Sequence, residues 1–174
     1  MKQDEVPVEN NFPEPRPASS PSYLDSIAER NQKISCRIPV NFNQDRLRGG
    51  QYISRRGNPS YFVLCSPGLY LVEYHVSISG IESVQSLGGL TLMLNGSPIE
   101  GSDAMASVCG GHSVANLSAS TLIELPPASK PASMALVGKS DGSFIVNSGN
   151  ILIIRWSEAG GYPRQPEAGG FSRN

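Results

Sequence analysis

Cysteine is scarce in this chain of 174 residues, which has only Cys36, Cys65 and Cys109. An odd number of cysteines without a C-x-x-C spacing does not suit a disulfide framework or a zinc site. We therefore expect buried thiols that act as small apolar side chains. No cofactor and no metal site is predicted.

Long hydrophobic runs and an excess of one charge are also missing. No apolar run approaches the roughly 20 residues of a membrane helix, so no membrane contact is expected. The net charge is −1, which gives no bulk attraction to nucleic acid. The first residues, MKQDEVPVENNFPEP, are acidic and proline-rich and contain no apolar segment typical of a secretory signal. We expect synthesis in the cytoplasm without a signal peptide.

Groups that could carry out catalysis are few. The chain has two histidines, His75 and His112, and no G-x-S-x-G turn that would present a nucleophile. Cys109 precedes His112 by three residues, but nothing near it in the sequence suggests an orienting third group or an oxyanion hole. The sequence does not predict an enzyme.

Turn residues are plentiful, with 18 glycines and 14 prolines. Between them lie short apolar or alternating runs at roughly ten-residue spacing, which predicts an all-β antiparallel jelly-roll sandwich of about ten strands. Asn95-Gly96 and Gly110-Gly111 are expected to form hairpin turns. The expected strands lie at 36–42, 61–65, 69–79, 90–100, 105–117, 121–125, 134–138, 143–147 and 151–156.

The run at 69–79 has bulky residues on both of its faces. In a strand, side chains alternate between the two faces. One face would therefore hold Tyr70, Val72, Tyr74 and Val76, and the other would hold Leu69, Leu71 and His75. One face can fill the sandwich and the other would be covered by another chain, but the pattern does not say which.

The first 35 residues have a different composition. Four prolines within residues 1–19 predict an extended arm. Residues 22–33 follow an S-x-x-D capping form with apolar residues at helical spacing, which predicts a short amphipathic helix. Because such a short helix is marginal alone, its apolar face should dock on a support. The anchor candidates on that face are Tyr23, Leu24 and Ile27.

A basic segment follows at residues 45–57. Residues 36–67 contain five arginines and one aspartate, which gives a local charge of +4. The segment predicts an exposed basic rim or ion pairs with acidic groups of a neighbouring chain, and nucleic acid is the less favoured partner. The basic patch comprises Arg46, Arg48, Arg55 and Arg56.

The last 17 residues contain an internal repeat, EAGGYPRQP followed by EAGGFSRN. Each copy combines glycines with an aromatic residue and an arginine, which is a common anchor pairing at interfaces. The repeat is either a duplicated docking motif or a flexible solvated tail at 158–174. Its candidate contact residues are Tyr162, Arg164, Phe171 and Arg173.

The order of several features is similar to that of a known superfamily. A Pro-Gly turn opens PGLYLVEYHVSI, and LNGSPIEGS, a Gly-rich segment, TLIELPP and ILIIRW follow. This order resembles the tumour-necrosis-factor/complement-globular-head superfamily over about Tyr61 to Trp156. It is most similar to the C-terminal domain of bacterial collagen-like spore-surface glycoproteins and to related phage fibre and decoration domains.

The resemblance implies a jelly-roll domain at 36–157 that forms a tight homotrimer and is not an enzyme. It suggests a structural module on a bacterial spore outer layer (exosporium) or a phage virion, bound to coat or capsid proteins through residues 1–35. A head that binds a host receptor or a glycan is the alternative. If His75 lay at the three-fold axis, assembly should weaken below roughly pH 6. The trimer-interface candidates are Leu69, Tyr70, Leu71, Val72, Tyr74, His75, Val76 and Trp156.

Overall fold

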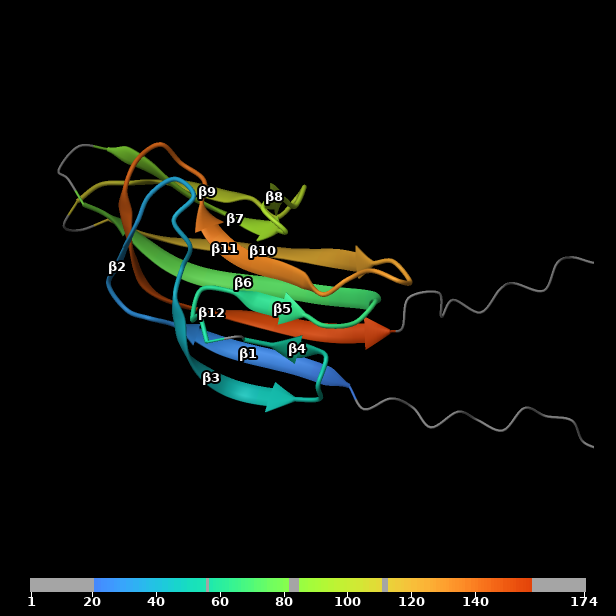
Figure 1. Cartoon of the computed structure of the whole chain (residues 1–174). Helices are drawn as coiled ribbons and strands as arrows, with labels where there is room; N and C mark the ends of the chain where they lie inside the picture. The colour runs from blue at the N-terminus through green and yellow to red at the C-terminus, as the bar shows by residue number, and fades with distance from the viewer. Residues whose placement is uncertain (1–20, 56, 82–84, 111–112, 158–174) are drawn as a thin grey trace, which may run out of the picture.

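The computed structural model describes residues 21–55, 57–81, 85–110 and 113–157. These residues form two antiparallel sheets that face each other (Figure 1). They include no α-helix, and so none that could span a membrane. The predicted all-β antiparallel jelly-roll sandwich is confirmed.

The first sheet, sheet A, contains most of the long strands. Its order is β10-β6-β12-β1-β3, and β2 pairs with the first residues of β12. β6 and β12 are paired over nearly their whole lengths at the centre of the sheet. The bounds are β1 Ser22–Ala28, β2 Gln32–Ile34, β3 Phe42–Gly49, β6 Gly68–Gly80, β10 Val114–Leu125 and β12 Phe144–Ser157.

The second sheet, sheet B, is built from shorter strands. Its order is β4-β5-β11-β7-β8, and β9 also pairs with β7. Asn95 and Gly96 both have positive φ between β7 and β8, which confirms the hairpin turn expected there. The bounds are β4 Ile53–Ser54, β5 Phe62–Leu64, β7 Ser86–Leu94, β8 Ser97–Pro98, β9 Ala104–Val108 and β11 Ala132–Gly138.

The core lies between the two sheets, and strand β6 contributes one complete face to it. Every second residue of β6 from Gly68 to Gly80 is buried. This arrangement corrects four interface candidates, because their side chains fill the core of their own sandwich and cannot contact a second chain. They are Tyr70, Val72, Tyr74 and Val76.

The helix predicted at 22–33 is wrong. Residues Ser22–Ala28 form β1, which lies between β12 and β3 and is hydrogen-bonded to both. Two flanking strands satisfy the backbone of this segment on both sides, and this pairing outweighs the weak preference of a three-turn helix. The sandwich therefore begins at Ser22 and not at residue 36.

Because residues 22–28 form a strand, the three anchor candidates do not share the face of a helix. Leu24 is buried in the core, whereas Tyr23 and Ile27 point away from it on the outer face of sheet A. All three belong to the sandwich itself. Any separate arm is limited to the residues before β1.

Three expected strand boundaries also differ. Residues 36–41 form only isolated bridges from Cys36 and Pro39 to β11, and Phe42 begins β3. The segment at 121–125 is the second half of β10, and the segments at 143–147 and 151–156 form the single strand β12. A bulge between Val146 and Ser148 interrupts β12 where the sequence suggested a turn.

The Gly-rich segment at 105–117 is not a hairpin. Its first strand, β9, pairs with β7 in sheet B, and the second, β10, pairs with β6 in sheet A. Gly80 and Gly110 form a bridge at this crossing, and a Cβ atom on Gly80 would lie 2.6 Å from the carbonyl carbon of Cys109. The glycines therefore let two backbones meet where the chain passes between sheets.

Candidate functional site

An apolar row crosses the outer face of sheet A. Leu71 on β6 is paired with Leu122 on β10 and with Ile154 on β12, and Ile154 is paired with Tyr23 on β1. Paired residues in a sheet project on the same side. We call Leu122, Leu71, Ile154 and Tyr23 the apolar row; Leu122 is 55% exposed and Tyr23 is 37% exposed.

At one end of this row, a glycine leaves space for the Tyr23 ring. Tyr23 is paired with Gly49 at the end of β3, and a Cβ atom on Gly49 would lie 2.5 Å from the Tyr23 ring. The ring therefore lies against Gly49, in space that the side chain of any other residue would fill. Gly49 therefore leaves the space that the Tyr23 ring occupies beside Ile154.

A buried carboxylate lies next to the apolar row. Asp25 is almost fully buried, and its Oδ2 atom accepts a hydrogen bond of 2.8 Å from Nε of Arg46, which also forms an ion pair with it. Nδ2 of Asn150 donates to the other oxygen at 3.4 Å. The Arg46 side chain is 60% exposed and covers the carboxylate, so Asp25 is neutralised before any second chain approaches.

Leu71 and three further interface candidates lie on or near this face. Leu69 and Leu71 are half-buried, and His75 is exposed beside them on the outer side of β6. Trp156, near the end of β12, is 69% exposed. These four remain candidates for an interface, in contrast to the four that face the core.

The basic patch is divided by the fold. Arg46 binds Asp25 as described, and the Arg55 side chain is mostly buried, where it forms an ion pair of 2.9 Å with Asp45 and lies 4.9 Å from the centre of the Phe62 ring. Burial lowers the pKa of Arg55, partly offset by Asp45. Arg48 is exposed. The partners of Arg46 and Arg55 are acids of the same chain.

Some sequence candidates lie outside the described residues. These are Arg56, His112 and all residues of the arm at 1–20 and of the tail at 158–174. The expectation of three buried thiols is wrong for Cys36, which is exposed, whereas Cys65 and Cys109 are half-buried. Cys36 lies in the irregular segment between β2 and β3, which is bridged to β11; Val40 of this segment is buried in the core, whereas Cys36 is not.

A groove on the outer face of sheet B was not expected from the sequence. It has a volume of about 660 Å³. Its floor includes Met93 on β7 and Ala135 on β11, and segments at 36–37 and 96–103 line it. The turn at Asn95-Gly96 was its only local signal, because the lining comes from distant parts of the chain.

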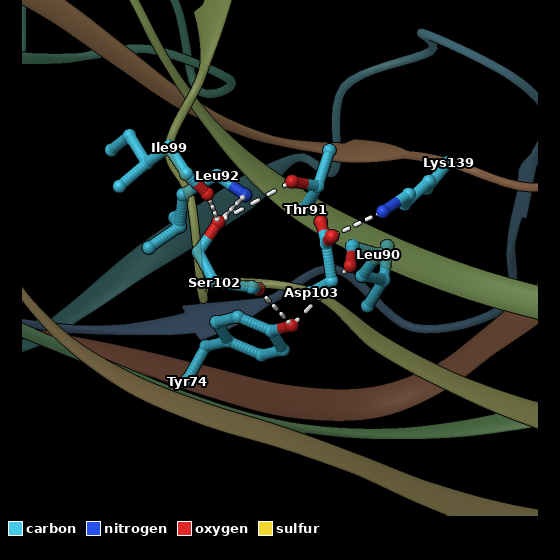
Figure 2. A network of polar contacts seen from close by, with 8 residues as sticks. All are labelled: Tyr74, Leu90, Thr91, Leu92, Ile99, Ser102, Asp103 and Lys139. Atoms are coloured by element: carbon cyan, nitrogen blue, oxygen red, sulfur yellow. Dashed lines mark hydrogen bonds and ion pairs between the residues drawn. The ribbon is translucent and has the colours of Figure 1, made fainter.

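A polar network joins this groove to the core (Figure 2). The Tyr74 hydroxyl on β6 donates to the Ser102 carbonyl at 2.8 Å. The Ser102 hydroxyl donates to the Ile99 carbonyl at 2.7 Å and accepts from the Leu92 amide at 3.0 Å. Tyr74 therefore fixes the segment that lines the groove to the centre of the sandwich.

An ion pair lies in the lining of the groove. Lys139 contacts the Asp103 carboxylate, and both side chains are about 40% exposed (Figure 2). Hydrogen bonds from Lys139 and from Thr91 lower the pKa of Asp103. The groove thus combines an apolar floor with fixed charges, which suits a ligand that has both an apolar group and charged groups.

Tyr74→Phe is expected to destabilise the protein by about 1–2 kcal/mol at pH 8, because the buried Ser102 carbonyl loses its donor. Burial raises the pKa of Tyr74 in the folded protein, whereas an unfolded tyrosine ionises near pH 10. The stabilisation is therefore full below about pH 10 and declines as the pH rises above it. Urea unfolding at pH 8 and pH 11 should show a smaller difference between the two proteins at pH 11; a constant difference would contradict this assignment.

The comparisons with known proteins concern the fold. No family model and no curated sequence matches this chain. Among solved structures, the globular domain of zebrafish complement 1qA protein superposes with a TM-score of 0.51 at 15% identity, covering 76% of this chain and 94% of that one. Murine APRIL at pH 5.0 superposes with a TM-score of 0.58 at 11% identity, covering 79% of this chain and all of that one. At these identities the likeness shows a shared jelly-roll fold.

Proposed function

We propose that this chain is a structural, non-enzymatic module that assembles as a homotrimer on the surface of a bacterial spore or a phage virion. The apolar row on sheet A is the observation on which the trimer rests. Leu122, Leu71, Ile154 and Tyr23 cross four neighbouring strands without a charged residue between them. A continuous apolar strip on one face of a sandwich is typical of a surface that another chain covers.

The polar groups beside the row are compatible with burial in an interface. Asp25 is already neutralised by Arg46, and Glu73 accepts a hydrogen bond of 3.0 Å from Ser120 on the next strand. A second chain that covered them would not have to supply a counter-charge for Asp25. This local neutralisation supports assembly through sheet A.

Several buried polar side chains have structural partners, which supports a non-enzymatic role. Asp25 joins three strands through Arg46 and Asn150, and Tyr74 holds Ser102. Arg155 donates to the Pro67 carbonyl at 3.0 Å and stacks 4.3 Å from the centre of the Tyr52 ring. Each of these groups links parts of the fold that are distant in sequence.

Sedimentation velocity of the purified full chain tests the trimer. At micromolar concentration we expect a single species with three times the mass of the 18.6 kDa chain. A monomer under these conditions would refute the proposal. The same experiment at pH 5 and pH 7.5 tests His75, which is exposed on the same face of β6 as Leu71: unchanged assembly at pH 5 would place His75 away from the three-fold axis.

The particle and the anchor are the finer part of the proposal. The resemblance to spore-surface and virion domains supports a particle surface, and the residues before Ser22 are the revised anchor because β1 belongs to the sandwich. Binding of the full chain and of a variant without residues 1–20 to isolated spores and to phage particles tests both points. We expect the full chain to bind one kind of particle and the shortened variant to remain in solution.

A further inference from the structure

The groove on sheet B has charged residues on two of its lining segments in addition to the Asp103–Lys139 pair. Arg37 belongs to the segment after β2, and Glu100 follows β8. Both are exposed, and within the described residues neither forms an ion pair. Between them lies the apolar floor with Met93 and Ala135. An occupant would therefore present an apolar group flanked by one acid and one base.

The tail of this chain has this composition twice. Its second copy, EAGGFSRN, places Phe171 between Glu167 and Arg173. Glu167 is complementary to Arg37, and Arg173 is complementary to Glu100. The glycines next to the phenylalanine have no side chain that would hinder its approach to a narrow groove.

A series of contacts connects the end of β12 to the lining of the groove. Arg155 near this end donates to the Pro67 carbonyl. Three residues before Pro67, Leu64 is paired with Ala132, and the next residue, Ser133, lines the groove. From Ser157 to Ser133, the residue spacings, the Arg155 side chain and one strand spacing along this route add up to at most roughly 35 Å.

The length of the tail favours the second copy of the motif over the first as the occupant of the groove. Phe171 follows Ser157 by 14 residues, which can span about 46 Å when extended. Tyr162 follows it by five residues, which can span only about 17 Å. Phe171 can therefore reach the groove along this route, whereas Tyr162 falls short of it.

We propose that the groove on sheet B binds the second tail motif of the same chain, with Phe171 on the apolar floor, Glu167 at Arg37 and Arg173 at Glu100. This proposal is independent of trimer formation and of the particle. It gives the duplicated motif a binding site on the protein's own surface. A ligand that used the groove would have to displace the tail.

Alkylation of Cys36 reports on this contact, because its thiol is exposed and lines the groove. The full chain and its Phe171→Ala variant are treated with iodoacetamide under native conditions, and each cysteine is quantified by peptide mass spectrometry. A short tether gives an effective concentration of about 1 mM, so a motif with a Kd of about 0.1 mM would be roughly 90% bound. We expect Cys36 to react about tenfold faster in the variant.

Two controls are available within the same experiment. Cys65, whose thiol contacts the Ser54 hydroxyl away from the groove, should react at the same rate in both proteins. Tyr162→Ala should change the rate at Cys36 by less than about twofold. An unchanged Cys36 rate in Phe171→Ala would overturn the proposal, and so would an equal effect of Tyr162→Ala.

A charge exchange tests the orientation of the motif. Arg173→Glu and Glu100→Arg should each increase the Cys36 rate, because each places like charges together. The double variant should return the rate toward that of the original chain. A synthetic peptide of residues 158–174 should restore protection when added to Phe171→Ala at millimolar concentration. Failure of both the double variant and the peptide to restore protection would refute this docking arrangement.

Discussion

Ile154→Glu is expected to convert the proposed trimer into monomers. Ile154 is the centre of the apolar row, paired with Leu71 on one side and Tyr23 on the other. A trimer would bury three new carboxylates without partners, and an unpaired buried charge costs several kcal/mol. Association should weaken by more than about a thousandfold. Sedimentation equilibrium at 10 µM should show the mass of a single chain.

A matched variant tests whether the effect depends on the face of the sandwich that carries the new charge or on the charge alone. Leu87→Glu introduces the same charge at an apolar side chain that is 48% exposed on sheet B, and it should leave the trimer intact. Thermal unfolding of both variants shows whether the fold is retained, as expected for two side chains that point away from the core. A trimer that persists in folded Ile154→Glu would place the interface elsewhere.

Gly149→Ala is expected to lower the free energy of unfolding by about 3 kcal/mol. Gly149 follows the bulge in β12 and is paired with Val76 on β6. A Cβ atom there would lie 2.6 Å from the His75 carbonyl oxygen and 2.9 Å from the Val76 Cα atom. Both contacts are with backbone in the centre of sheet A, so relief requires the two longest strands to separate.

Gly142→Ala is the control for this change. A Cβ atom on Gly142 would meet its nearest neighbour, the Leu87 carbonyl oxygen, at 3.4 Å, which is ordinary contact. Urea unfolding should therefore show a change within about 0.5 kcal/mol for this variant. Equal stability of the two alanine variants would mean that the β6–β12 pair tolerates a side chain at Gly149.

Strand β6 shows what the sequence alone could predict. Every second residue from Tyr70 to Ile78 is aromatic or β-branched, and this period of two is compatible with a strand and not with a helix. The choice of the buried face could not be made from the pattern, since both faces have bulky side chains. Pairing with β10 and β12 places Tyr70 and Tyr74 inside, where each hydroxyl finds a backbone carbonyl.

Strand β1 shows why prediction failed elsewhere. Its inward side includes Ser22 and Ser26 beside Leu24, so the apolar alternation of a buried strand is broken. Ser26 is satisfied by a hydrogen bond of 2.7 Å to Asp45, 19 residues later. Such a partner cannot be recognised from local sequence. A period near 3.6 was left as the strongest signal, and it indicated a helix.

The groove and the ion pairs could not be predicted from the local sequence for the same reason. Arg46 with Asp25 and Lys139 with Asp103 are separated by 21 and 36 residues. Only the pairing of strands within and across the sheets sets these distances. The sequence shows that the arginines are clustered along the chain. It does not show that Arg46 and Arg55 form ion pairs with acidic residues of the same chain, as they do in the structure.

Because Ser22 is paired with Arg155, the described chain enters and leaves the sandwich at the same end. β1 begins and β12 ends at the same pole (Figure 1). The opposite pole carries the connection between β11 and β12 and the exposed apolar side chains of Ile81 and Val114. A support that holds the chain by either terminus would therefore leave this pole facing outward. A peptide inserted after Asp141, which is exposed there, would be displayed toward the medium, so the domain is suited to use as a display scaffold.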